Sequence, residues 1–370
     1  MEHFTVLAIE SSCDETAVAI LSAPKKPNAE APPRLLASVI SSQIAIHREH
    51  GGVIPELASR NHSADLPVVI RQACREAGIS PSDPDIFAAT SGPGLVAALL
   101  VGNSTAKALA LATGKPYISV NHLEGHLLSP FIAHGEEPPP HLGLVVSGGH
   151  TLFVDVASFG NYTLIGRSQD DAAGEAFDKV GKMLKLPYPG GPEIDAHAKR
   201  GNPHAFNFPR GLLKQDTLDV SFSGLKTSVL YTLPKIIPSG NPDELPPQTL
   251  DDICASFQQA VIDVLCSKAM KALEQTGRDT LALSGGVSCN SGLRARLERE
   301  CSEKGIRLIL PEKIHTTDNA AMIAYAAMLH ARRGKSDSLH EDVNPNLKLT
   351  QDPNRSKTDK SIDNANIEGI

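Results

Sequence analysis

The sequence predicts an α/β protein with two lobes and a cleft between them. Residues 4–21 and 142–158 each show the pattern of two apolar strands joined by a polar or Gly-rich turn, and alternating strand and helix patterns follow both. The chain has no Trp and only 4% aromatic residues, so its core must consist mainly of Ala, Val, Ile and Leu, as in buried parallel strands and helices. Its 370 residues suffice for about two domains.

The first half continues from its strand pair through a Pro-rich loop at 23–34. Apolar runs then predict a strand over 35–43, a helix over 63–77, a strand, turn and helix over 85–114, and a strand and helix over 117–131. Gly114 is a predicted C-cap, because Gly tolerates the left-handed conformation that often ends a helix.

The second half begins at residue 141. After its strand pair, the pattern predicts helices over 170–186 and 250–275, a strand, Gly turn and helix over 281–300, a strand over 307–311 and a helix over 316–334. The stretch 187–249 is rich in Gly, Pro and Asn and is expected to hold only short ordered pieces. We expect one lobe to comprise 1–126 with 309–333, the other to comprise 127–308, and the polar residues 334–370 to form a disordered tail.

Charge and cysteine usage exclude several classes of protein. A formal net charge of -7 argues against a protein that binds nucleic acid along its whole surface. Any contact with nucleic acid must therefore be local or shared with partners. The six cysteines form no CxxC pair, which indicates reduced thiols. No stretch approaches the ~20 apolar residues of a membrane span, and the N-terminus leaves no room for a signal peptide. We expect a cytoplasmic protein without a membrane segment.

Two histidines, His122 and His126, have the spacing that places them on one face of a helix, where both imidazoles can reach one ion. The same spacing is also typical of two partly exposed helical histidines. Leu123 occupies the position at which an HExxH metalloprotease carries its general-base Glu, and the acid here is Glu124. The zinc-protease interpretation therefore lacks its key residue.

Three Gly-rich turns follow predicted strands, at 91–94, 145–151 and 283–290. Gly lets a backbone approach a phosphate, and exposed N–H groups supply donors. One such turn is weak evidence, but three of them with the polar turn ESSCDET indicate a nucleotide cleft. None matches a P-loop or a Rossmann fingerprint. The acidic run DDAAGEAFDK (170–179) also fits a solvated helical face, and Asp318 also fits a helix N-cap.

Ten motifs in order resemble one known family. They are IESSCDET, GGVIPELASR, SGPGL, NHLEGHLLSPF, LVVSGGHT, DDAAGEAFDK, PGGP, SFSGLKT, SGGVSCN and TTDNAAMIA. Together they closely resemble the tRNA N6-adenosine threonylcarbamoyltransferase family (TsaD type), once labelled O-sialoglycoprotein endopeptidase. The resemblance covers roughly residues 4–333 and is closest to the bacterial and organellar branch.

The resemblance implies a fold and a set of site residues. The family fold is the two-lobed actin-like ATPase and sugar-kinase (ASKHA) fold. In the family the HxxxH pair and the Asp of TDNA bind one metal, Fe²⁺ or Zn²⁺, which here assigns His122, His126 and Asp318. The implied substrate-binding residues are Val145, Val146, Ser147, Gly148, Gly149, Asp178, Gly191, Asp195 and Asn290. Asp14 and Glu15 match positions near the reacting group, where one of them would accept a proton.

The implied reaction transfers a threonylcarbamoyl group from threonylcarbamoyl-AMP to N6 of adenosine 37 in the anticodon loop of ANN-decoding tRNAs. The implied partners are this tRNA, a paralogous subunit without the metal site and a small P-loop ATPase (TsaB and TsaE type). Between 179 and 235 the chain has nine basic and four acidic residues, so we expect this segment to face tRNA unless it is an ordinary basic patch. The helices over 63–77 and 95–112 are candidate docking surfaces for the paralogous subunit, although core burial explains their small apolar residues equally well.

Three other functions stay open at this point. A metal-dependent glycopeptidase fits the old family label, but it lacks the protease Glu. A non-catalytic nucleotide-binding partner subunit fits the fold, but it would not need a metal site. A sugar or acid kinase of the same superfamily would use a carboxylate base and Mg-ATP without an HxxxH pair.

Overall fold

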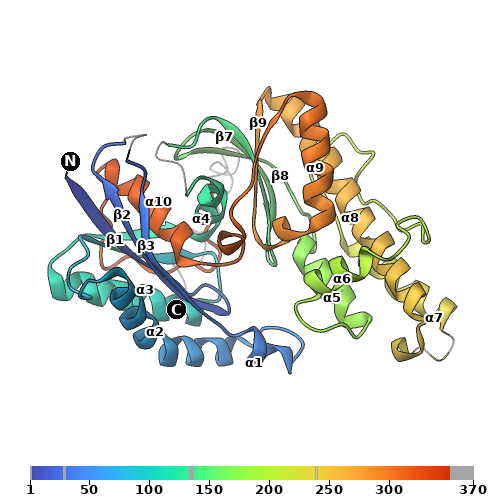
Figure 1. Cartoon of the computed structure of the whole chain (residues 1–370), viewed down its shortest axis with the longest axis horizontal. Helices are drawn as coiled ribbons and strands as arrows, with labels where there is room; N and C mark the ends of the chain where they lie inside the picture. The colour runs from blue at the N-terminus through green and yellow to red at the C-terminus, as the bar shows by residue number, and fades with distance from the viewer. Residues whose placement is uncertain (1, 28–30, 133–136, 238, 240, 351–370) are drawn as a thin grey trace, which may run out of the picture.

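A computed structural model describes residues 2–27, 31–132, 137–237, 239 and 241–350 of the chain. Two five-stranded sheets organise it (Figure 1). The first has the order β3-β2-β1-β4-β5, in which β1 pairs antiparallel with β2 and parallel with β4. Its strands are β1 (His3–Glu10), β2 (Glu15–Pro24), β3 (Arg34–Ser42), β4 (Ile86–Gly92) and β5 (Tyr117–Asn121).

The second sheet repeats the plan of the first. Its order is β10-β9-β6-β7-β8, and β6 pairs antiparallel with β7 and parallel with β9. Its strands are β6 (His141–Val146), β7 (Thr151–Ser158), β8 (Asn161–Arg167), β9 (Thr280–Ser284) and β10 (Arg307–Ile309). Each half of the chain therefore opens with an antiparallel hairpin and adds parallel strands through helical crossovers, as the strand patterns predict.

The first sheet is buried on both faces, which explains its nearly continuous apolar strands. Alternate residues of β1 face opposite sides: Leu7 and Ile9 pack with α2 (Pro55–Ala77) and α3 (Val96–Thr113), while Val6 and Ala8 pack with α10 (Ala320–Arg332). Thus the last described helix returns to the first sheet. A short helix, α1 (Ile44–Arg48), follows β3 toward the second lobe (Figure 1).

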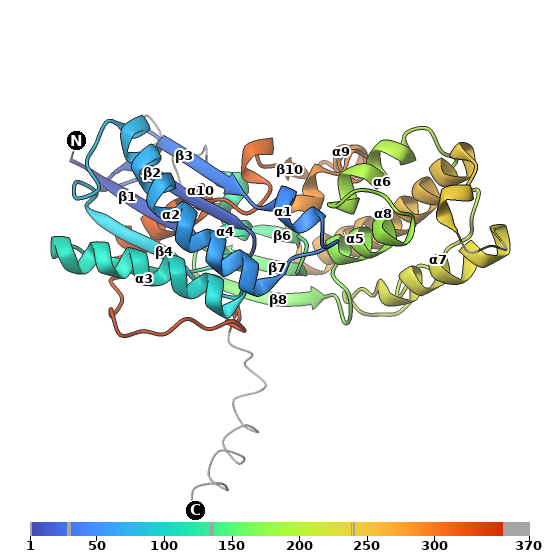
Figure 2. The ribbon, with the colours of Figure 1, turned by 90° about the horizontal axis from the view of Figure 1, so that it is seen from below.

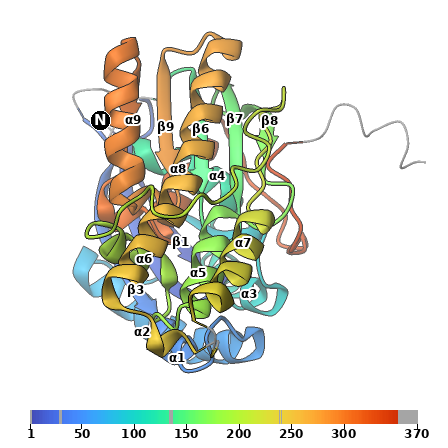
Figure 3. The ribbon, with the colours of Figure 1, turned by 90° about the vertical axis from the view of Figure 1, so that its right-hand side faces the viewer.

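The second sheet carries a thick helical layer on one face, which lies toward the viewer in Figure 3. Its core combines β6, Phe153 and the helices α5 (Ala173–Met183), α7 (Ser223–Ile236), α8 (Pro247–Thr276) and α9 (Ser291–Lys304). The short helix α6 (Gly190–Ala198) packs on α5 and α8. The pattern predicted α5, α8 and α9 within a few residues, but α6 and α7 lie in the stretch predicted to be largely irregular.

The helix α4 (His122–Leu128) lies between the two lobes (Figure 1). Leu128 packs with α10 and the first sheet, whereas Leu123 and Leu127 pack on Val145 and Val154 from the opposite face of the second sheet. All seven residues of α4 are buried. This helix therefore joins the apolar cores of the two lobes.

By length and composition alone, α3 is long and apolar enough to span a membrane. We expected no segment with these properties. The helix α3 is the single described helix that has them. One flank of α3 is buried against the first sheet and α2, through residues such as Leu99 and Ala106. Packing in the helical layer of this lobe accounts for that flank, whereas Val96, Leu100 and Leu111 stay exposed.

Residues 335–350, within the segment predicted as a disordered tail, run as an extended strap along the first lobe (Figure 2). Asp337 accepts a hydrogen bond from the Ser119 backbone N–H at 2.8 Å, and the Asn344 N–H donates to the Ser91 carbonyl at 2.8 Å. Leu339 packs on the first lobe core and Leu349 on the second lobe. Backbone hydrogen bonds thus order a polar segment, while residues 351–370 lie outside the described part of the chain.

Candidate functional site

The two histidines and Asp318 come from helix ends that asparagine side chains fix. Asn121 Oδ1 accepts hydrogen bonds from the N–H groups of Leu123 and Glu124, so α4 begins at His122 directly after β5. Asn319 Oδ1 likewise accepts from the Met322 N–H at the start of α10. The cap of α10 is therefore Asn319, which leaves the carboxylate of Asp318 free for another role.

The structure brings these three side chains together between the two lobes. His126 Nε2 lies 3.0 Å from Asp318 Oδ1, and His122 Nε2 lies 3.5 Å from the same oxygen. One ligand atom from each residue lies within 4.8 Å of the others, and His122 and His126 are buried. Two imidazoles and one carboxylate form a donor set for a transition metal that leaves coordination positions open.

Glu10, at the end of β1, holds the orientation of His122. Its fully buried carboxylate lies 3.0 Å from His122 Nδ1 and accepts hydrogen bonds from the Ser12 N–H and the Thr90 hydroxyl. With Nδ1 bound to a carboxylate, Nε2 is directed at Asp318, which is the usual arrangement behind a metal-binding histidine. Glu10 lies in the IESSCDET motif, but no local pattern in the sequence indicates which group it contacts.

The surroundings carry an excess of negative charge. Burial raises the pKa of Asp14, and the charge of Asp318 raises it further. Burial also raises the pKa of Glu15 to about 8, with Asp14 and Asp318 acting in the same direction. A divalent cation beside Asp318 would offset these carboxylates, so the electrostatics and the donor set both fit a metal ion.

One carboxylate oxygen of Glu15 lacks a hydrogen-bond partner within the described part of the chain. Its Oε1 accepts a hydrogen bond from the Ser42 hydroxyl at 2.9 Å, whereas its buried Oε2 has no hydrogen-bond partner among the described residues. A buried carboxylate oxygen without a partner is rare in folded proteins and is typical of functional sites. Asp14 lies beside it in the turn between β1 and β2.

The Gly-rich turn between β6 and β7 lies next to the histidines. Val145 and Val146 end β6, and Ser147 closes the turn through its N–H bond to the His150 carbonyl at 2.8 Å. Gly148 and Gly149 are exposed, and a Cβ on either would meet nothing within 4 Å, so a ligand has room to reach their backbone.

His150, which the sequence analysis did not single out, follows Gly149 at the end of this turn. Burial, together with the charges of His122 and His126, lowers its pKa to about 4. His150 therefore stays neutral beside the two histidines. The GGHT motif was the only sequence signal for it.

The remaining predicted substrate residues lie in the second lobe, where Gln258 on α8 joins two of them. Gln258 donates to Asp195 Oδ1 at 3.1 Å and accepts from Asn290 Nδ2 at 2.6 Å. Asp178 on α5 accepts from the Gly190 N–H at 2.8 Å, adjacent to Gly191 at the start of α6. Sequence reasoning missed Gln258, because nothing in its helix pattern distinguishes it from a surface glutamine.

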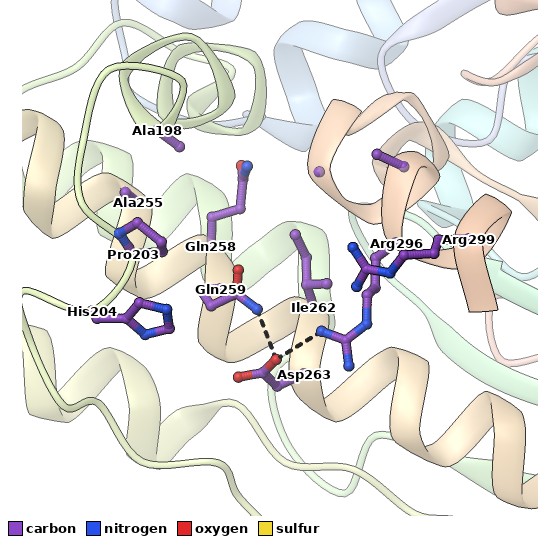
Figure 4. Close-up of a pocket in the computed structure, with 12 residues that line it drawn as sticks. Ala198, Pro203, His204, Ala255, Gln258, Gln259, Ile262, Asp263, Arg296 and Arg299 are labelled. Atoms are coloured by element: carbon purple, nitrogen blue, oxygen red, sulfur yellow. Dashed lines mark hydrogen bonds and ion pairs between the residues drawn. The ribbon is translucent and has the colours of Figure 1, made fainter.

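Gln258 also lines a cavity of about 490 Å³ between α6, α8 and α9 (Figure 4). Arg296 and Arg299 lie on one side, and Ile262 and Gly292 form part of the wall. A Cβ at Gly292 would approach Ile262 Cδ1 to 2.8 Å, so Gly keeps this wall open. The size and mixed polarity of the cavity suit a planar polar group such as a nucleobase.

Glu124 cannot serve as a protease base. Its carboxylate accepts from the Tyr162 hydroxyl at 2.9 Å and lies 2.7 Å from His330 Nε2, so both oxygens are occupied. These contacts tie α4 to β8 and α10. Glu124, the acid within the HxxxH segment, therefore has a structural role.

Comparison with known proteins agrees with this geometry. A profile of the family "TsaD: tRNA N6-adenosine threonylcarbamoyltransferase" matches residues 34–325. The chain belongs to this family. It is 46% identical over 351 residues to the tRNA N6-adenosine threonylcarbamoyltransferase of Clostridioides difficile, across 95% of this chain and 100% of that protein. It is 49% identical over 338 residues to the Pelobacter propionicus threonylcarbamoyltransferase, across 91% and 95% of the two chains. The chain is thus a member of a transferase family of tRNA modification.

A solved structure supports the fold. Full-length HypF, in its phosphate- and nucleotide-bound form, superposes with a TM-score of 0.56 at 14% identity, over 89% of this chain and 55% of that chain. Such a distant match concerns the fold alone. It confirms the predicted two-lobed ASKHA architecture.

Proposed function

We propose that this chain transfers the threonylcarbamoyl group of threonylcarbamoyl-AMP to N6 of adenosine 37 in ANN-decoding tRNAs, in the cytoplasm. The observation that carries the proposal is the convergence of His122, His126 and Asp318 beside the open Gly148–Gly149 turn. A metal site next to a phosphate-binding turn suits a donor that has a carboxylate-bearing end and a phosphate.

A divalent ion, Fe²⁺ or Zn²⁺, held by His122, His126 and Asp318 would supply a Lewis acid for the threonylcarbamoyl end of the donor. The N–H groups of Gly148 and Gly149 would bind the donor phosphate, because the turn is open at both positions. Val145, Val146 and Ser147 shape the turn. AMP is a good leaving group, so the protein contributes mainly positioning and charge stabilisation.

The nucleoside of the donor would extend into the second lobe. Gln258 lines the cavity of about 490 Å³ and is hydrogen-bonded to Asp195 and Asn290, which would bind the ribose and orient the adenine. Asp178 and Gly191 lie together at the junction of α5 and α6 and would contact the same nucleoside.

Glu15 is the better candidate to accept the proton released from N6. Its Oε2 has no partner among the described residues, and burial raises its pKa to about 8, near the pH at which a general base works best. Asp14 would act beside it by supporting the charge of the attacking amine. Either residue would move a proton only after tRNA has placed N6 within hydrogen-bond distance.

The partners implied by family membership are tRNA, a paralogous subunit without the metal site and a small P-loop ATPase. On the outer face of α2 and α3, Val68, Val96, Leu100 and Leu111 are exposed. These exposed apolar side chains support the predicted docking of the paralogous subunit there.

A transfer assay tests the proposal. The chain is incubated with threonylcarbamoyl-AMP, its partner subunits and an ANN-decoding tRNA, and modified adenosine is measured by mass spectrometry. We expect product with the wild type and with Asp342→Ala, an exposed control, and none with Asp318→Ala. Absence of product from the wild type, beside an active reference transferase, would contradict the proposal and favour a non-catalytic nucleotide-binding subunit.

The other candidate activities have their own readouts. Chelator-sensitive hydrolysis of a sialoglycoprotein would support the glycopeptidase, which the occupied carboxylate of Glu124 disfavours. ATP-dependent phosphorylation of a small acid or sugar would support a kinase.

A further inference from the structure

Most of the basic segment over 179–235 is neutralised within the chain. Six of its nine basic residues pair with carboxylates: Lys179, Lys185, Lys199, Arg200, Arg210 and Lys226. Among the described residues, no carboxylate lies within ion-pair distance of Lys182, Lys214 or Lys235. Paired side chains contribute little to phosphate binding, so the positive segment of the sequence is not a uniform RNA-binding surface.

One of the unpaired cations, Lys182, lies at the junction of the lobes. With Arg48 from α1 it lines a hollow of about 200 Å³, together with Gly51, Asp178 and Tyr188. Each cation contacts a backbone carbonyl on the other side of the junction. Arg48 Nε donates to the Tyr188 carbonyl at 3.0 Å, and Lys182 Nζ lies 3.5 Å from the Gly51 carbonyl.

Both cations keep hydrogen-bonding capacity. Arg48 and Lys182 are exposed, and within the described parts of the chain neither has a carboxylate partner. The terminal amino groups of Arg48 make no hydrogen bond with these residues. An Arg guanidinium and a Lys ammonium at one hollow can bind a phosphate oxygen. The carboxylate that also lines the hollow, Asp178, is held by the Gly190 N–H.

An aromatic side chain and a carboxylate, Tyr188 and Asp178, also line the hollow. Burial raises the pKa of the Tyr188 hydroxyl. Tyr188 therefore remains a neutral hydrogen-bond donor with an aromatic face. An aromatic ring beside cations is a common environment for an unstacked RNA nucleotide.

We propose that the hollow between Arg48 and Lys182 binds a backbone phosphate of the tRNA next to the target adenosine, with Tyr188 beside this phosphate. The inference rests on the proposed transfer to tRNA. The donor phosphate is the other source of the same chemistry, but the open Gly148–Gly149 turn already provides for it. The exposure of Arg48 and Lys182 also suits a ligand that reaches the cleft from outside.

The test compares two double variants in the full chain, assembled with the partners that support transfer. Arg48→Gln with Lys182→Gln removes the proposed contacts, and Lys214→Gln with Lys235→Gln removes equal charge from unpaired lysines elsewhere in the same segment. Binding of an ANN-decoding tRNA is measured over a range of salt concentrations, and KM is measured for the donor and for tRNA. Thermal melting verifies that both double variants are folded.

We expect the Arg48/Lys182 variant to bind tRNA about fivefold more weakly per lost cation near 0.1 M salt, with the salt slope smaller by about 0.7 per cation. Its KM for the donor should match the wild type, and the Lys214/Lys235 variant should bind tRNA as the wild type does. Unchanged tRNA affinity and slope in the Arg48/Lys182 variant would overturn the inference, as would a rise confined to the donor KM. Failure of the wild type itself to bind or modify tRNA would instead contradict the proposed function.

Discussion

Replacement of Glu10 by Gln should weaken metal binding by about 10- to 100-fold, the range typical of a carboxylate behind a metal-binding histidine. The Glu10 carboxylate lies 3.0 Å from His122 Nδ1 in a fully buried setting. A hydrogen bond to a charged group contributes about 1.5–3 kcal/mol, and tenfold in affinity corresponds to about 1.4 kcal/mol. The exchange of this charged contact for a neutral one therefore gives an effect of the expected size.

The assay is competition for Zn²⁺ between the metal-stripped chain and a chromophoric chelator, together with the visible spectrum of the Co²⁺ form. Gln keeps the size of Glu10 and one acceptor oxygen, so the fold should persist in thermal melts. Glu124→Gln is the matched control, because it also removes a buried carboxylate that contacts a histidine, but its carboxylate contacts Tyr162 and His330 rather than a metal ligand. If Glu10→Gln binds Zn²⁺ as tightly as Glu124→Gln, and the Co²⁺ spectrum does not change, the proposed role of Glu10 is refuted.

Three other perturbations have defined outcomes. Burial raises the pKa of Glu15 to about 8, so its contribution to stability is complete below its ordinary pKa and is lost as the pH rises toward 8. Glu15→Gln should therefore flatten the fall in melting temperature between about pH 5 and pH 9, and an unchanged fall would contradict the assignment. A chain that ends at Gly334 should lose about 2–4 kcal/mol of stability in urea unfolding, through Leu339 and Leu349, relative to one that ends at Thr350. Gly292→Val should raise KM for the donor but not for tRNA, because its side chain would enter the cavity beside α8; an unchanged donor KM would place the nucleoside elsewhere.

The sequence predicts most of the frame because both halves follow strong periodic patterns. The two hairpins, α3 with its left-handed Gly114, and the long helix α8 lie close to their predicted ranges. By contrast β8 was missed, because it is largely exposed and shows no clear alternation. The helix α7 was missed because Gly224 and Pro234 are residue types typical of loops, although Pro234 lies in the last turn of the helix.

The site could be predicted only where the chemistry is local in the sequence. The spacing of His122 and His126 indicates a shared helical face, and the structure brings Asp318 to them. The contacts of Glu10 and Gln258 depend on elements that are distant in the chain, so periodicity carries no signal for them. The same holds for the basic segment, where the ion pairs that neutralise it come from α8 and other distant elements.

The metal dependence of transfer tests the role of His122, His126 and Asp318 most directly. Metal-stripped wild type should form no modified adenosine, and one equivalent of Fe²⁺ or Zn²⁺ should restore transfer. Asp318→Ala should stay inactive at every metal concentration while it melts as the wild type does. Full transfer by the metal-stripped chain, or by Asp318→Ala, would contradict a metal held by His122, His126 and Asp318.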